Sequence, residues 1–195
     1  MAKSSGAKGF DYRGSLYGVA ASPMNITVLI KGSQTLTLGD AVRVDDAGLA
    51  VVCGATSLVG GIVRDIVDKN SLSVFSPRSS RGIATVSGDD TVTTGSTNTT
   101  VDLLKAVIEL ALPGGSVYYN DANGDFAQTN LFQFFDLTST GDQVDQGTAS
   151  EAAAVVQLIK IDPDGDADAS KGLFIFAETQ LPGTIADAAT AKVAA

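Results

Sequence analysis

Residues 39–48 read GDAVRVDDAG, and this stretch decides the fold. A short strand leads into Asp45-Asp46-Ala47-Gly48, and residues 49–52 (LAVV) return as a second strand-like run. Asp side chains hydrogen-bond to nearby backbone in turns, and Gly accepts a positive φ. The stretch therefore predicts a β-hairpin. Residues 60–77 (GGIVRDIVDKNSLSVFSP) predict a second hairpin around the polar turn VDKN.

A related pattern recurs in the second half of the chain. Residues 114–124 (GGSVYYNDANG) match residues 39–48 with one inserted residue, and residues 155–182 repeat the second hairpin around a longer acidic turn. Two hairpins in the same order thus occur twice. This order predicts an internal duplication of a small β module.

The sequence as a whole predicts a mainly β protein. Gly at turns and β-branched residues in short runs are typical of strands joined by tight turns. We expect two tandem small β-barrel or β-sandwich-like modules with an extended N-terminal arm. Residues 100–112 fit either a short helix or a strand, and the duplication favours a strand. The expected boundaries are an arm at 1–24, modules at 25–87 and 100–183, a linker or exposed loop at 88–99, and a loose tail at 184–195.

Composition excludes several classes of function. The formal net charge is −9 and the sequence pI is about 4.3, which disfavours binding to nucleic acid or to an anionic membrane surface. No apolar stretch approaches the roughly 20 residues that span a bilayer, and no signal peptide is visible. The single cysteine, Cys53, cannot form an intramolecular disulfide, which indicates production in a cytoplasm.

The chain also lacks the residues of common catalytic sites. It contains no His, and it has no phosphate-binding, dinucleotide-binding or nucleophile-elbow motif. We therefore expect neither an enzyme nor a cofactor, and no small-molecule substrate. An enzyme that uses only carboxylates would need two converging acids, and no sequence pattern indicates such a pair.

Two acidic runs raise the question of a metal site. Asp121-Ala-Asn-Gly-Asp125 carries an oxygen-bearing side chain at every second position, as calcium loops do, but Gly falls at position 4 rather than 6. A hairpin turn explains it better. The run at 162–168 is the better calcium candidate, although an acidic solvated turn is the default interpretation. Its candidate ligands are Asp162, Asp164, Asp166 and Asp168.

Several residues are candidates for binding a protein partner. The first 24 residues combine basic groups with large apolar side chains, which is unusual in a free tail and typical of a segment that docks. The three aromatic residues at 132, 134 and 135 belong either to the core or to a partner surface. Arg78 and Arg81, which flank a Ser-rich turn, are weaker candidates. The arm candidates are Lys3, Lys8, Phe10, Tyr12, Arg13, Leu16 and Tyr17.

The run from 39 to 75, with its GDAVRVDDAG hairpin and the following GGIVRDI, resembles the decoration (cement, head-stabilising) proteins of tailed-bacteriophage capsids. Residues 113–181 share the resemblance more loosely. The resemblance implies a structural virion protein that trimerises on the outer capsid surface and clamps neighbouring major capsid subunits. It would be made in the host bacterial cytoplasm, and its N-terminal arm would be the clamp. Deletion of residues 1–20 is then expected to leave a folded protein that no longer binds capsids.

Two other functions stay open at this point. One is another virion component, such as a head-fibre base or a minor tail protein. The other is a calcium-dependent carbohydrate-binding or adhesin module, in which Tyr118 and Tyr119 stack on sugars and the acidic turn at 162–168 holds calcium.

Overall fold

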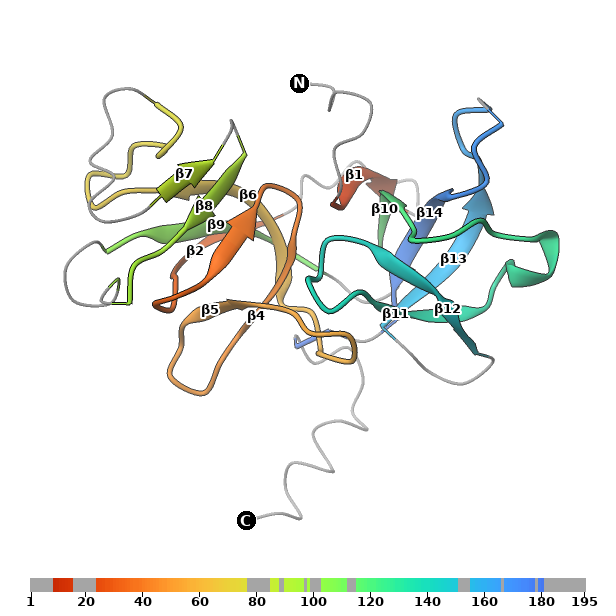
Figure 1. The fold of residues 1–195 in the computed structure, drawn as a ribbon, viewed down its shortest axis with the longest axis horizontal. Coiled ribbons are helices and arrows are strands. Elements are labelled where there is room, and N and C mark those ends of the chain that lie inside the picture. The colour runs from red at the N-terminus through yellow and green to blue at the C-terminus, as the bar shows by residue number, and fades with distance from the viewer. Residues whose placement is uncertain are drawn as a thin grey trace, which may run out of the picture.

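The protein is mainly β and forms two lobes that lie side by side (Figure 1). The computed structural model describes residues 9–15, 24–76, 85–87, 90–96, 98, 103–111, 115–150, 155–165, 167–177 and 179–180. Within these residues the one helical element is a 3-10 turn, η1 (Gln128–Asn130). None of the described segments forms a helix long and apolar enough to cross a membrane.

The first lobe consists of two antiparallel sheets. A five-stranded sheet has the order β2-β9-β6-β4-β5, and a three-stranded sheet has the order β3-β8-β7. The isolated bridge between Ile30 and Ala50 brings the end of β2 next to β5. The strands are β2 (Asn25–Leu29), β3 (Thr35–Thr37), β4 (Ala41–Val44), β5 (Ala50–Val52), β6 (Gly61–Val67), β7 (Thr85–Ser87), β8 (Thr91–Thr93) and β9 (Lys105–Leu110).

The second lobe is built on one six-stranded sheet with the order β1-β10-β14-β13-β11-β12. Its first strand, β1, comes from the N-terminal region, so the described part of the chain begins in the second lobe, crosses to the first, and returns. The strands are β1 (Asp11–Ser15), β10 (Ser116–Asp121), β11 (Phe134–Leu137), β12 (Val144–Ser150), β13 (Val156–Ile161) and β14 (Lys171–Phe176).

Three of the predicted hairpins are confirmed. β4 pairs with β5 across the turn at 45–49, where the Asp45 carboxylate accepts the backbone N–H of Ala47 and Leu49 at 3.0 Å and Gly48 has φ +77°. β6 turns at Asp68 and returns through a bridge between Val67 and Ser73. β13 pairs with β14 across the long acidic turn.

The fourth predicted hairpin is wrong. β10 does not form a ladder with the segment directly after its turn. Its neighbours in the sheet are β1 and β14, which are distant in sequence. In the first lobe the corresponding strand, β4, lies between β5 and β6. The strand neighbours therefore differ in the two lobes, and the structure does not reproduce the predicted duplication as a repeated pairing pattern.

Two segments near the expected module boundaries form strands that pair within the first lobe. Residues 105–110 form a strand, as the duplication favoured, but β9 pairs with β2 and β6 of the first lobe rather than with the second module. The expected linker at 88–99 contains β8, which pairs with β3 and β7. Residues 184–195 lie outside the described part of the chain.

Two hydrophobic clusters form the core. One lies in the first lobe and includes Ile30, Leu36, Val63, Ile66 and Leu104. The other joins the lobes, because it packs Ala41, Cys53, Val59 and Ile62 from the first lobe against the aromatic side chains of the second. Those aromatic side chains are Phe10, Tyr118, Phe126, Phe135, Phe174 and Phe176.

Candidate interaction surfaces

The N-terminal segment at 9–15 binds both lobes. Phe10 donates its backbone N–H to Gly39 O at 2.8 Å in the first lobe, while β1 pairs with β10 in the second. The Phe10 side chain is fully buried, with its ring centroid 5.0 Å from that of Phe176 and 6.2 Å from that of Tyr118. This segment is therefore part of the joint between the lobes.

A partly buried ion pair holds the same segment from the first lobe. Arg64 Nε lies 2.7 Å from Glu109 Oε2, and Arg64 Nη1 donates to Phe10 O at 3.0 Å. Arg64 Nη2, Glu109 Oε1 and the Tyr118 hydroxyl are buried, and none of the three has a hydrogen-bond partner among the described residues. Burial, together with the nearby Glu109 carboxylate, raises the pKa of Tyr118 well above its usual value. The phenol therefore stays neutral.

These contacts revise the expectation for the N-terminal arm. Phe10 anchors this chain's own core, so in this conformation its side chain is not available to a partner. Tyr12 is half-buried and packs against the same cluster. Arg13 is exposed, and its Nε lies 3.5 Å from Asp11 Oδ2. Its guanidinium carbon lies over the Tyr119 ring, 4.7 Å from the ring centroid. The predicted partner-binding residues Lys3, Lys8, Leu16, Tyr17, Arg78 and Arg81 lie outside the described residues.

The acidic turn at 162–168 uses carboxylates to hold its own backbone. Asp162 Oδ2 accepts the Ala167 N–H at 3.0 Å, and Asp168 Oδ1 accepts both the N–H and the hydroxyl of Ser170. Those Ser170 hydrogen bonds and the Lys171 ammonium hold the pKa of Asp168 below its ordinary value. In the described part of the chain no three acidic or cysteine side chains converge as metal ligands; Asp166 lies outside it.

The run at 121–125 is likewise bound to its neighbours. Asn123 Oδ1 accepts the Gln146 N–H at 2.9 Å, and Asn123 Nδ2 donates to Asp145 Oδ1 at 2.9 Å. Ala122 N–H reaches Ser170 O at 2.9 Å. The run therefore joins β10 to the β12 strand and to the acidic turn, and the Asn123 side-chain amide makes structural hydrogen bonds.

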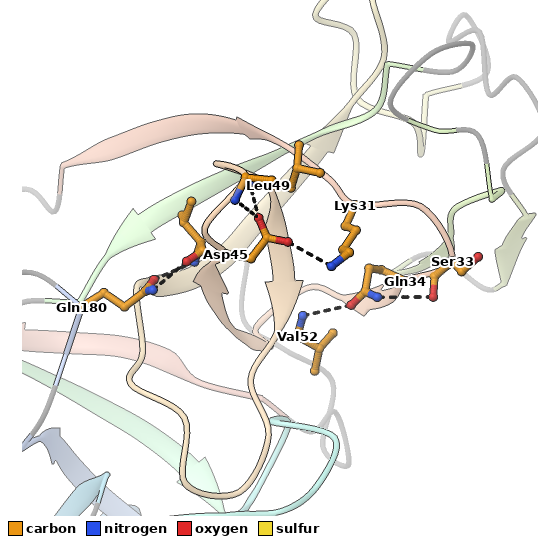
Figure 2. Close-up of polar contacts among 9 residues, drawn as sticks. Lys31, Ser33, Gln34, Asp45, Leu49, Val52 and Gln180 are labelled. Atoms are coloured by element: carbon orange, nitrogen blue, oxygen red, sulfur yellow. Dashed lines mark hydrogen bonds and ion pairs between the residues drawn. The ribbon is translucent and has the colours of Figure 1, made fainter. Parts of the chain in front are cut away.

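The β4–β5 hairpin is fastened on two sides (Figure 2). On one side the Gln180 side chain accepts the Val44 N–H at 2.6 Å and donates to Val44 O at 2.7 Å, as a neighbouring strand would. On the other, Lys31 pairs with Asp45 at 3.1 Å and Gln34 accepts the Val52 N–H at 3.2 Å. Sequence reasoning missed Gln180, because its partner is 136 positions away.

Two cavities differ in chemistry. A polar cavity of about 340 Å³ lies where the two lobes meet, with lining from Ser, Thr and Gln side chains and from Asp40 and Asp142. An apolar pocket of about 220 Å³ is lined mainly by strands β2, β4 and β9 of the five-stranded sheet, together with Gln180. We call this second cavity the Ile108 pocket. Its described lining is Ile26, Val44, Gly60, Ile108, Leu110 and Gln180.

The aromatic cluster at 132–135 divides between core and surface. Phe135 is fully buried, Phe134 is half-buried, and the Phe132 side chain is 66% exposed. Phe132 also has φ +65°, a conformation that favours Gly. The sequence showed the cluster but carried no signal for which ring faces solvent, because Phe132 lies in the turn between η1 and β11, outside any strand alternation.

The two tyrosines of the carbohydrate hypothesis are not exposed stacking platforms. Tyr118 is fully buried, and Arg13 covers the Tyr119 ring. Burial, with Asp121 nearby, raises the pKa of Tyr119 to about 12.

In comparisons with known proteins, no family model, no curated protein and no solved structure matched this chain.

Proposed function

We propose that this chain is a structural virion protein that binds the outside of a tailed-phage capsid and stabilises it by clamping neighbouring major capsid subunits. One observation carries the proposal: the residues that resemble decoration proteins fold as one antiparallel unit. β4 pairs with β5 across the Asp/Gly turn, and β6 pairs back onto β4. This is the strand–turn–strand order that the resemblance implies. Two small modules derived from a duplication, and assembly as a homotrimer, belong to the same proposal.

Our proposal assigns the capsid contact to the parts of the N-terminal arm that do not join the lobes. Residues 9–15 join the lobes, so the proposed capsid contact lies in the flanking residues, with Lys3 and Lys8 before the strand and Leu16 and Tyr17 after it. A segment that orders on docking can add main-chain hydrogen bonds to the edge of a neighbouring sheet. Basic groups in this otherwise acidic chain would pair with acidic groups on the shell.

The first experiment counts copies of the chain in purified particles from the source lysate by quantitative mass spectrometry. Copies in a simple ratio to the major shell protein, on the order of hundreds per particle, support a decoration protein. A few to a few dozen copies indicate a head-fibre base or minor tail protein instead. Absence from the particles overturns the virion proposal.

A second experiment tests the clamp. Particles stripped of this chain are mixed with the full-length protein or with a variant lacking residues 2–8, and heat-induced DNA release is measured. The variant keeps Phe10 and β1, so it should fold but bind particles more weakly. If the two proteins bind particles to the same occupancy and protect equally against heat-induced DNA release, residues 2–8 do not contribute to capsid binding.

The calcium-dependent carbohydrate module receives less support. Its proposed stacking residues are buried or covered, and the Asp162 and Asp168 carboxylates of the acidic turn accept backbone N–H groups. Glycan binding that saturates and is abolished by a chelator would reverse this ranking.

A further inference from the structure

Phe132 presents a large apolar side chain to solvent from a backbone that is held in place. Its N–H donates to Leu158 O at 2.8 Å, and its carbonyl accepts from Gln157 Nε2 at 2.9 Å. The backbone carbonyl of the next residue, Gln133, accepts the Leu158 N–H at 3.1 Å. The ring therefore projects from a fixed position at the end of η1, beside the six-stranded sheet.

This arrangement is unfavourable for the isolated chain in two ways. A residue with a Cβ adopts the left-handed conformation at an energetic cost, and Gly or Asn would adopt it more readily. An exposed phenyl ring adds no burial energy. Strained residues that persist at the surface, and aromatic residues that anchor interfaces, are both associated with binding. Phe132 thus has the features of an anchor for a partner.

The Ile108 pocket has the size and chemistry to receive such a ring. Its volume is about 220 Å³. Apolar cavities of roughly 150 Å³ take up benzene, so a phenyl side chain fits this volume. The pocket belongs to the first lobe, whereas Phe132 follows η1 in the second lobe.

We propose that Phe132 of one copy inserts into the Ile108 pocket of a second copy. Electrostatics favours this pairing over a contact between charged parts of the surface. Copies of a chain with net charge −9 repel one another, but the loop at 127–135 contains no charged residue and neither does the described pocket lining. The two surfaces meet without placing like charges together and without burying an unpaired charge.

The contact joins two different surfaces, so it is heterologous. Such contacts close into rings when the rotation between copies allows it, and otherwise form open chains. A ring agrees with the homotrimer in the proposed function, but the inference concerns self-association and does not require a capsid. One aromatic ring buries about 150–250 Å², far less than the roughly 1,200 Å² of a stable interface. Association should therefore depend on protein concentration.

The test places a benzoyl-phenylalanine photo-cross-linker at position 132, which keeps an aromatic ring there. Isotopically heavy and light protein are mixed at high concentration, irradiated, digested and analysed by mass spectrometry. We expect heavy–light cross-links from position 132 to peptides that contain Ile26, Val44, Ile108 or Leu110. Cross-links only within one copy, cross-links to other surfaces, or no cross-links would overturn the inference.

A pair of variants separates the anchor from general surface hydrophobicity. Phe132→Asn suits the left-handed backbone and should fold, but its association measured by sedimentation should fall at least tenfold. Leu72→Asn is the matched control, since Leu72 is also an exposed apolar residue, 41% exposed, but belongs neither to the pocket lining nor to the loop at 127–135. Equal association by the two variants would overturn the proposal. A folded, self-associating chain that is absent from particles would instead overturn only the virion function.

Discussion

Asp136 and Asp145 are directly opposed on β11 and β12, so two carboxylates face each other across the sheet. Burial, together with Asp145, raises the pKa of Asp136 above its ordinary value. The folded chain therefore holds this proton more tightly than the unfolded chain. Ionisation of Asp136 costs stability once the pH exceeds the ordinary Asp pKa of about 4, and the full cost is present above the raised pKa.

Asp136→Asn should therefore stabilise the protein at neutral pH. Like charges opposed on neighbouring strands cost roughly 0.2–1 kcal/mol, so a gain of that size is expected in urea unfolding at pH 7. At about pH 3, below both pKa values, the gain should disappear. Asp125→Asn, at an exposed position, is the control and should change little at either pH. A gain that persists at the acidic pH would contradict the charge explanation.

Arg64 and Glu109 give the second prediction at this scale. Arg64→Met leaves a nearly buried carboxylate without its counter-ion and removes a hydrogen bond to Phe10 O, so we expect a loss of about 3 kcal/mol or more. Lys31→Met breaks the more exposed pair with Asp45 and should cost at most about 1 kcal/mol. Chemical unfolding at neutral pH measures both; similar losses would show that burial of the first pair has no special effect.

At the scale of elements, β1 was expected to be part of a partner-binding arm, but in the structure it belongs to the joint between the lobes. Truncation before residue 16 removes β1 and the buried Phe10 ring, and loss of a buried Phe typically costs about 3–5 kcal/mol. Truncation of residues 2–8 keeps both. We expect the longer truncation to lower the thermal midpoint strongly and the shorter one to change it little. Equal midpoints would mean that β1 does not stabilise the joint between the lobes.

The elements that sequence reasoning found are those with local signals. The Asp45 and Asp68 carboxylates accept backbone N–H groups two to four residues ahead in the sequence. A short stretch of sequence is therefore enough to predict each of these hairpins. β10 carries the same turn chemistry, yet its partners β1 and β14 come from the two ends of the described chain. No local pattern identifies such partners. The lobe to which β9 belongs was missed for the same reason.

The candidate surfaces were predictable to different degrees. The sequence located the aromatic cluster at 132–135 and the N-terminal segment, but it did not show that Phe10 is buried and Phe132 exposed. Both residues lie just outside strands, where alternation in the sequence does not indicate which side chain is buried. The burial of Phe10 depends on packing against the second lobe. The Ile108 pocket combines residues from five separate parts of the chain, which no sequence motif brings together.

At the scale of the whole molecule, the lobes share one core. Ala41, Cys53 and Ile62 of the first lobe pack in the same cluster as the aromatic rings of the second, and Gly141 O accepts the Ala41 N–H across the joint at 3.0 Å. Thr179 also bridges to Val59. These contacts make the two lobes energetically dependent on each other.

We therefore expect a single cooperative unfolding transition rather than two. Backbone circular dichroism and tyrosine fluorescence should give the same midpoint and slope in urea. A fragment covering residues 24–111 should not fold alone, since it would expose its side of the shared core. Two separate transitions, or a stably folded fragment, would favour independent tandem modules.

Cys53 has a practical consequence for chemistry on this protein. Its thiol is the single cysteine of the chain, it is fully buried, and burial raises its pKa to about 12. Only thiolates react readily with alkylating reagents, so the native protein should resist maleimide labelling. A cysteine introduced at an exposed position such as Leu72 would then be the sole conjugation handle. Cargo or dyes could be attached there one per chain, without first removing the natural thiol.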